Sequence, residues 1–421
     1  MRTKLTVLVS TTLALVLVLT SLIGVVSAEG EGTTIAGGFN GPMGVLVAPD
    51  GSVWVIDSGV GGETEVPFVD PETGQDSTAK LGDTARVVQI ALDGTQTVAA
   101  NLPSMAAGMD TLGGARLALL NGSLYATSGI YIGDPSSSPM PNMAAVVKVE
   151  NGQVSQVAST WDLEKSQNPG GFVFDSHPYG LAAGPDGRLW VADAGANDVF
   201  TVDPASGDIE LVAVIDGLPG PFPNPARDGA METDPVPTGV AFDQAGNAYV
   251  SLLSGFPFVP GSAKVVKISS DGQVSDYATG LTMLTDLRTG PDGTMYAVQF
   301  GQFTEEGPSP NSGNIIRVKA GDASEVVVSG LSFPTSIDFN ANGDAYVTIN
   351  GVGAPGSGEV VMFSALTTMA GTPLADIAPA ALPETGGEYP FSGWMAGLLL
   401  AFGLTLAATG FFLKRRTSVA G

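Results

Sequence analysis

The central part of the chain repeats one pattern of apolar and turn-forming residues. In each unit, alternating apolar residues lead to a glycine-containing turn, and a second short apolar run follows. A period of two predicts β-strands, and glycine-containing turns between such runs predict tight hairpins. The turn glycines recur at six positions: Gly51, Gly122, Gly187, Gly246, Gly293 and Gly343.

A second apolar hairpin follows most of these turns, for example residues 265–268 with 274–277. Each unit therefore holds four short strands. Four-stranded units repeated along a chain are the signature of a β-propeller. The pattern predicts an all-β, six-bladed β-propeller over residues 29–366, with no long helical segment between the units.

The two ends of this repeat complement each other. Residues 33–38 have the pattern of a fourth strand that lacks its first three, whereas the last unit ends after its third strand at 359–363. We expect the N-terminal strand to complete the last blade, which would close the ring and leave no exposed strand edge between the first and last blades.

The long connections are predicted to lie on one face of the ring. Turns between first and second strands, and between third and fourth strands, are short throughout. The longer segments all belong to the other two connection types, which emerge on one face: 57–84, 127–143, 159–176, 216–236, 254–262, 300–312 and 350–358. Insertion by drift is the simple explanation, but drift would affect both faces. The asymmetry favours a binding face.

The N-terminal residues 1–28 have the pattern of a secretory signal peptide. A basic start is followed by an apolar run and by small residues ending at Ala28. The run is also long enough to remain as an uncleaved membrane anchor. Both alternatives predict export of the repeat region.

The C-terminus carries a second predicted targeting signal. After a linker at 367–381, residues 382–386 read LPETG, an apolar stretch of 23 residues covers 391–413, and a basic tail occupies 414–421. A stretch of this length can cross about 30 Å of hydrocarbon as a helix. This arrangement resembles the LPxTG sorting signal of Gram-positive surface proteins, in which a sortase cuts between the residues here numbered Thr385 and Gly386. A plain transmembrane anchor is the alternative. The predicted location is the cell surface, on the wall or the membrane.

Composition narrows the chemistry. The formal charge is −25, which excludes a nucleic-acid reader because phosphate binding needs clustered Lys and Arg. The chain has no Cys and one His, so thiol nucleophiles, disulfides and multi-His metal centres are excluded. No cofactor is certain, although an acidic chain is compatible with Ca²⁺ or Mg²⁺.

The candidate site residues stand where strands meet the long-connection face. The candidate ligand contacts are His177, Tyr179, Arg288, Gln299, Asn350, Phe256 and Phe258. His177 could act as a base, but a hydrogen-bonded loop histidine is favoured. Arg288 could pair with Asp286 or receive an anion, and the segment 254–261 could stack on a flat ligand or cap the ring. The candidate metal ligands are Asp57, Asp193 and Asp286, which could equally bond loop N–H groups.

Residues 177 to about 300 resemble the ScyD/ScyE-type family of secreted propellers. The resemblance lies in the runs His177-Pro178-Tyr179-Gly180, Ala192-Asp193-Ala194-Gly195-Ala196-Asn197, Pro223-Asn224-Pro225, Val236-Pro237-Thr238-Gly239, Ser254-Gly255-Phe256-Pro257-Phe258 and Tyr277-Ala278-Thr279-Gly280-Leu281. More distantly, the repeats resemble NHL-type propellers. The resemblance implies an exported propeller of undetermined biochemistry.

Three functions remain open. The favoured hypothesis is a surface-anchored binding module for a protein, a glycan or a small molecule, with a sortase as its processing partner. The second is a metal-assisted hydrolase or lyase, although the paired histidines of streptogramin lyases, a G-x-S-x-G motif and an H-E-x-x-H motif are all absent. The third is a structural envelope protein.

Overall fold

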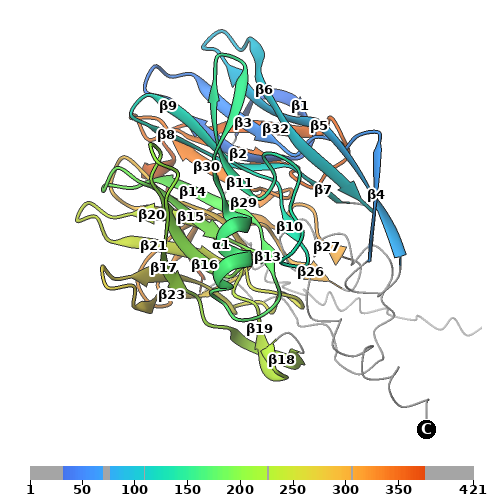
Figure 1. Cartoon of the computed structure of the whole chain (residues 1–421). Coiled ribbons are helices and arrows are strands. Elements are labelled where there is room, and N and C mark those ends of the chain that lie inside the picture. Colours follow the sequence, from blue (N-terminus) through green and yellow to red (C-terminus); the bar gives the residue numbers. More distant parts are fainter. Residues whose placement is uncertain (1–31, 70–75, 109, 225–226, 305–306, 375–421) are drawn as a thin grey trace, which may run out of the picture.

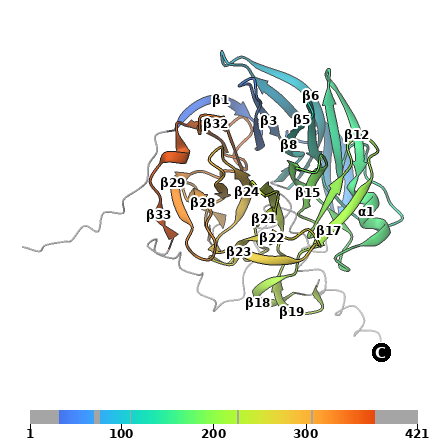
Figure 2. The same cartoon turned by 90° about the vertical axis from the view of Figure 1, so that its left-hand side faces the viewer.

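The computed structural model describes residues 32–69, 76–108, 110–224, 227–304 and 307–374. Within them the fold is all-β, with a single short α-helix. The strands form sheets arranged around a common axis (Figures 1 and 2). The predicted fold class, all-β, is therefore confirmed.

Six sheets of the described residues contain four or more strands each. The first has β2 (Pro42–Val47), β3 (Val53–Asp57), β5 (Asp76–Ile90) and β6 (Gln96–Ala107), extended by β4 (Thr64–Val69) and β7 (Asp110–Leu112). The second has β8 (Gly114–Leu120), β9 (Ser123–Ser128), β11 (Ala145–Glu150) and β12 (Gln153–Ser159). The third has β14 (Pro178–Ala183), β15 (Leu189–Asp193), β16 (Asp198–Val202) and β17 (Ile209–Val214).

The remaining three sheets follow the same order. The fourth has β20 (Pro237–Phe242), β21 (Ala248–Leu252), β22 (Ala263–Ile268) and β23 (Val274–Leu281). The fifth has β24 (Leu284–Thr289), β25 (Met295–Gln299), β28 (Gly313–Arg317) and β29 (Glu325–Leu331), with β33 (Thr372–Pro373) at its outer edge. The sixth has β30 (Ser336–Phe339), β31 (Ala345–Ile349), β32 (Gly358–Phe363) and β1 (Thr33–Phe39).

Several segments expected to be loops form regular structure instead. They contain α1 (Thr160–Gln167) and three short pairs, β10 (Tyr131–Ile132) with β13 (Asp175–Ser176), β18 (Leu218–Asn224) with β19 (Ala230–Thr233), and β26 (Phe303–Thr304) with β27 (Gly307–Pro308). The segment 57–84 holds β4 and the start of β5. These strands are largely exposed or polar, so the apolar alternation that marks a half-buried strand is missing from them. A 3₁₀ turn, η2 (Leu366–Thr368), follows β32.

The first strands of successive sheets contact one another around the axis. β2 contacts β8, and the contacts continue through β14, β20, β24 and β30 back to β2. β1 pairs antiparallel with β32, with Thr34 opposite Val361 and Phe39 opposite Gly358. The sixth sheet is thus completed by the other end of the repeat region, as the sequence pattern predicts.

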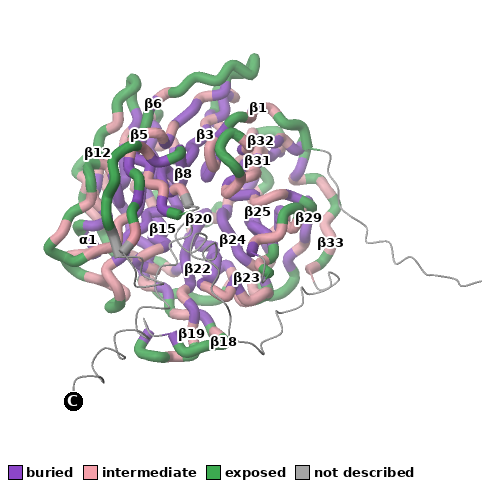
Figure 3. The backbone as a smooth tube through the Cα atoms, turned by 90° about the vertical axis from the view of Figure 1, so that its right-hand side faces the viewer, coloured by how far each residue is buried: buried purple, intermediate pink, exposed green. Residues whose placement is uncertain are grey.

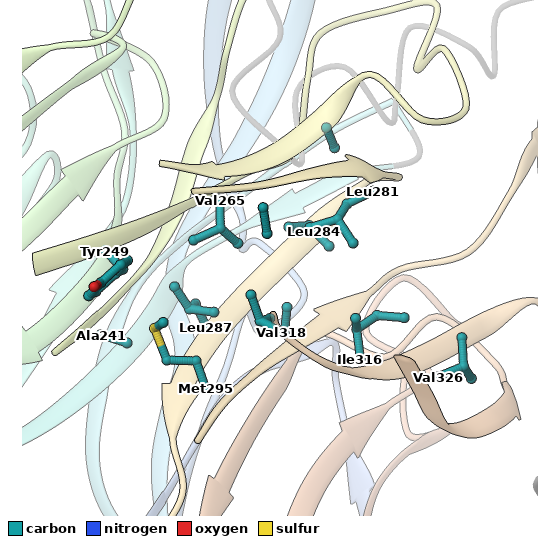
Figure 4. Close-up of a cluster of buried hydrophobic side chains, with 13 residues drawn as sticks. Ala241, Tyr249, Val265, Leu281, Leu284, Leu287, Met295, Ile316, Val318 and Val326 are labelled. Atoms are coloured by element: carbon teal, nitrogen blue, oxygen red, sulfur yellow. The ribbon is translucent and has the colours of Figure 1, made fainter. Parts of the chain in front are cut away.

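Apolar side chains fill the spaces between neighbouring sheets. Figure 4 shows one such cluster, in which Val265 and Leu281 of the fourth sheet meet Leu284 and Leu287 of the fifth. Burial is concentrated on the inner strands, and exposed residues are frequent at the turns and outer strands (Figure 3). The core is therefore divided largely into wedges between the sheets, and long-connection residues such as Phe258 and Phe300 form a further buried cluster.

A buried arginine fills the axis of the ring. Arg116, on β8, is fully buried, and its guanidinium donates to the main-chain carbonyls of Met43 on β2 and Thr285 on β24. It also donates to the carbonyl of Thr335, beside β30, at 2.8 Å. Its Nε lies 3.3 Å from Asp286 Oδ1, and its plane covers the ring of Tyr179 at 4.5 Å. One side chain thereby connects the first, second, third, fifth and sixth sheets.

The closing strand yields a prediction about stability. Phe39 is 1% exposed and packs with Val45, Val55 and Val360. We expect Phe39→Ala to lower the free energy of unfolding by about 3–5 kcal/mol, the usual cost of removing a buried aromatic ring. Leu92→Ala, at a site 82% exposed, is the control and should cost less than about 0.5 kcal/mol. Equal effects in urea unfolding would show that β1 does not hold the ring closed.

The axial arginine yields a second prediction. Arg116→Met leaves several carbonyls without their buried donor and removes the charge that balances the Asp286 carboxylate, so it should destabilise the fold by about 3–5 kcal/mol. Lys148→Met removes an exposed ion pair with Glu150 and should cost no more than about 1 kcal/mol. Urea unfolding of both variants is the measurement. A fully stable Arg116→Met variant would contradict a structural role for the axial guanidinium.

Candidate functional site

A polar pocket of about 130 Å³ opens among the connections of the first and sixth sheets. It is lined by Asn40, Gly41, Met43, Ser58, Gly59, Thr111, Gly351, Val352, Gly353 and Pro355. Most of these residues connect a fourth strand to the next first strand, or a second strand to a third. Because the strands alternate in direction, those two connection types emerge on the same face of the ring. The pocket therefore lies on the long-connection face.

Asp57, at the end of β3, organises one wall of this pocket. It is fully buried, and its carboxylate accepts the N–H of Asn40 at 3.2 Å and Nε of Arg86 at 3.0 Å. Burial raises its pKa, and the Arg86 guanidinium opposes that shift. Asp57 therefore accepts hydrogen bonds from loop N–H groups, which was one of the two roles considered from the sequence.

Glycines allow the pocket loops to approach one another closely. Gly59 donates its N–H to Asn40 O at 3.1 Å, and Ser58 donates to Gly41 O at 2.9 Å. Gly59 has φ +77°, and a Cβ there would lie 2.4 Å from the carbonyl carbon of Thr84. A side chain at Gly59 would therefore force the loops apart.

Aromatic side chains from the fourth, fifth and sixth sheets cover the axis beside the pocket. Phe258 is 1% exposed and lies 4.9 Å from the ring of Phe303, and Phe300 lies 5.5 Å from Phe333. Phe256 packs against the same cluster, which also contains the pocket residue Val352. Of the two roles considered for the 254–261 segment, this packing favours capping the ring.

His177 is buried and faces the interior. It is 3% exposed, and its ring packs edge-to-face on Tyr179 at 5.5 Å. Burial lowers the pKa of His177 to about 4, so the imidazole is neutral at neutral pH. Its backbone N–H donates to Asp193 Oδ1. These features favour a structural role over a general base.

Four carboxylates from α1, β13 and the third sheet gather beside His177: Glu164, Asp175, Asp193 and Asp198. All four are buried, with exposures between 0% and 2%. Asp193 and Asp198 are directly opposite each other at the ends of β15 and β16. Burial raises the pKa of Glu164 to about 8 and that of Asp193 to about 6, with the charge of Asp193 adding to the shift of Glu164. We name this group the third-sheet carboxylate cluster.

The three aspartates predicted as metal ligands do not come together. Asp57 and Asp193 end β3 and β15, Asp286 lies within β24, and the axis near Asp286 is occupied by Arg116. Among the residues that the structure describes, no group of three His, Cys, Asp or Glu side chains could hold a metal ion. The proposed shared site is therefore wrong, because each carboxylate is used within its own part of the ring.

The other predicted ligand contacts are mostly inside the protein. Arg288 lies 3.7 Å from Asp286, one of its two expected partners, and donates to Leu181 O at 3.2 Å. Tyr179 is 1% exposed beneath Arg116, and Gln299 is 8% exposed at the end of β25. Asn350 lies immediately before the pocket residue Gly351, and its Nδ2 donates to Ser357 O. Asn350 of this set adjoins the pocket lining in sequence, and Tyr179 contacts the lining residue Met43 from the interior.

Three buried charged side chains that organise the axis and the third-sheet carboxylate cluster were missed by the sequence reasoning. Arg116 is a charge at an expected apolar position of a first strand, and that irregularity was a usable signal. Asp198 could have been found by extending the hairpin register from Asp193 across its turn. Glu164 lies on α1, which the sequence pattern did not predict, so nothing placed it near the third sheet.

The predicted targeting segments at the two ends of the chain lie outside the described residues. This applies to the signal peptide 1–28, the LPETG motif with Thr385 and Gly386, the apolar stretch 391–413 and the basic tail 414–421. Within the part of the chain that the structure describes, no helix is long and apolar enough to span a membrane.

Comparison with known proteins adds little about chemistry. No family model and no curated protein matches the chain. Solved structures similar to it include the calcium-binding protein regucalcin from Agrobacterium tumefaciens, with 12% identity, TM-score 0.45 and coverage of 82% of this chain and 95% of that one. A gluconolactonase from Xanthomonas campestris has 12% identity and TM-score 0.42, with coverage of 80% of this chain and 98% of that one. Virginiamycin B lyase from Staphylococcus aureus has 13% identity and TM-score 0.40, with coverage of 77% of this chain and 95% of that one. These similarities are too weak to transfer a substrate, a metal or an activity.

Proposed function

We propose that this chain is an exported six-bladed β-propeller of the ScyD/ScyE type that binds a ligand on its long-connection face. The six sheets would be the blades, and β1 would close the last one. The observation that carries the binding role is the position of the polar pocket. It lies among the connections that the sequence predicts to be long, whereas the short turns belong to the opposite face.

The size and lining of the pocket define the ligand class. Drug-sized ligands occupy pockets of roughly 300–1,000 Å³. A pocket of about 130 Å³ lined by Asn40, Ser58, Thr111 and several glycines suits one small polar group. With a formal charge of −25, the protein repels anions. A neutral hydroxyl-rich group, such as a terminal sugar of a glycan, fits both conditions best.

Binding is favoured over catalysis by the state of the candidate catalytic groups. The single histidine is buried and neutral, and it packs away from solvent. The metal-assisted hydrolase or lyase alternative relied on Asp57, Asp193 and Asp286, which serve separate structural roles. A structural envelope protein is the other alternative, and it predicts no specific ligand for the pocket.

The pocket gives a direct test of the binding role. Thr111→Trp would fill it from β7, so we expect this variant to lose binding to a glycan array at least tenfold. Thr95→Trp places the same side chain on an exposed turn of the opposite face and is the matched control. Labelled full-length protein and both variants are applied to the same array.

Two results would count against the proposal. Retention of glycan binding by Thr111→Trp would place recognition elsewhere on the protein. Absence of binding by the wild-type protein to every neutral glycan on the array would remove the support for a glycan ligand and favour the structural alternative.

We further propose that the body is displayed on the cell surface by its C-terminal signal. A sortase that cuts between Thr385 and Gly386 would leave the body attached to the wall without residues 386–421. Deleting residues 382–386 should move the protein from the wall fraction to the membrane fraction, because the apolar stretch 391–413 is then retained. Deleting the linker residues 376–380 is the control and should not change the fraction. Mass spectrometry of released wall protein ending elsewhere than Thr385 would contradict sortase processing.

A further inference from the structure

The third-sheet carboxylate cluster places several buried carboxylates close to one another, so their negative charges would repel. Asp193 and Asp198 face each other as a directly opposed pair, and like charges in that position repel. Glu164 approaches the same place from α1, and burial raises the pKa of Asp198, with the charges of Asp193 and Glu164 adding to the shift. Among the described residues, no Lys, Arg or His side chain forms an ion pair with Glu164, Asp193 or Asp198.

The carboxylates differ in how far their oxygens are used. Asp193 is fully engaged, since Oδ1 accepts the N–H groups of His177, Gly195 and Ala196 and Oδ2 accepts the hydroxyl of Ser176. Asp198 is the opposite case, because it is 0% exposed and neither carboxylate oxygen has a hydrogen-bond partner within the described part of the chain. Glu164 Oε2 is also buried without a partner. An unpaired buried carboxylate is costly unless a proton or a cation compensates it.

Two buried hydroxyls belong to the same group of side chains and are linked to it through Asp193. The hydroxyls of Thr160, on α1, and Ser176, on β13, lie 2.6 Å apart, and both residues are buried. The Ser176 hydroxyl then bonds Asp193. The loop from β15 to β16 is packed tightly here, because a Cβ at Gly195 would lie 2.4 Å from Asp175 Oδ1. Carboxylate and hydroxyl oxygens from α1, β13, β15 and β16 therefore meet in one enclosed place.

We propose that the third-sheet carboxylate cluster binds one Ca²⁺ ion, with Asp198 and Glu164 as its charged ligands. Ca²⁺ takes six to eight oxygen ligands and accepts carboxylates, carbonyls, hydroxyls and water in flexible geometry. Two carboxylates with neutral oxygens satisfy this preference, and they do not require a group of three acidic side chains, of which the described residues show none. The ion would neutralise the Asp198 and Glu164 charges and tie α1 to the third sheet.

The test uses full-length protein freed of metal with chelator at pH 7.5. Isothermal titration with Ca²⁺ should reveal one strong site, and Ca²⁺ should raise the melting temperature. Asp198→Asn and Glu164→Gln keep the side-chain shape and remove one charge each, so each should weaken the strong site at least tenfold. Asp162→Asn, at an exposed carboxylate on the same helix, is the matched control and should bind as the wild type does.

Protons are the competing explanation, and pH separates the two. Because burial raises the folded-state pKa of Glu164 to about 8 and that of Asp193 to about 6, chelated protein should lose stability as pH rises from 5 to 8. The groups that face Glu164 are Asp175, His177, Asp193 and Asp198. On our proposal Ca²⁺ restores the stability lost at pH 8 in the wild type and Asp162→Asn, and fails to do so in Asp198→Asn.

Three results would overturn the proposal. One is the absence of a strong Ca²⁺ site at pH 7.5. Another is a melting temperature at pH 8 that Ca²⁺ leaves unchanged, which would mean that protons alone compensate the cluster. The third is unweakened binding in both Asp198→Asn and Glu164→Gln, which would place the ion elsewhere. Circular dichroism of the two variants verifies that they are folded. None of these results depends on the polar pocket or on Thr111.

Discussion

The ring depends on how its axis is filled. First strands of successive sheets converge there, and their main-chain carbonyls need donors that a neighbouring strand cannot supply. Arg116 meets this need because a guanidinium carries five N–H donors in one plane. It serves the carbonyls of Met43, Thr285 and Thr335 while its charge is balanced by Asp286. The same side chain fills the axis, and the polar pocket lies among the connections at the face.

Buried negative charge is treated in two different ways in this acidic protein. Asp57 and Asp286 each have an arginine as partner, and their role is to hold strands and loops in place. In the third-sheet carboxylate cluster, Glu164, Asp193 and Asp198 have no ion-pair partner among the described residues, and on our proposal a Ca²⁺ ion compensates their charge. This difference is the physical reason for seeking a cation there and not on the axis, where cationic side chains are already present.

The two faces of the ring have different physical characters. Short glycine turns give the face opposite the pocket little surface that could vary. The long-connection face carries helix α1, three short strand pairs and the polar pocket. It also carries the aromatic cluster of Phe256, Phe258, Phe300, Phe303 and Phe333. Several of its loops are fixed by backbone hydrogen bonds that involve glycines, such as Gly59 with Asn40 and Ser58 with Gly41. A pre-formed surface of this kind needs little ordering when it binds a partner, which favours recognition.

The sequence by itself determined the elements that depend on local patterns. Alternating apolar residues and glycine turns determined the strands and their hairpins, and the unmatched strand at 33–38 determined the pairing of β1 with β32. It also indicated that Asp57 and Asp193 could bond loop N–H groups, because Asp at the end of a strand does so locally. Only the tertiary structure decided the rest. The contacts of Arg116 join residues 73 to 219 positions apart. Glu164 approaches Asp198 from α1, a helix that the sequence periodicity did not predict. These long-range contacts depend on how the sheets pack around the axis, and a local sequence pattern carries no information about that packing.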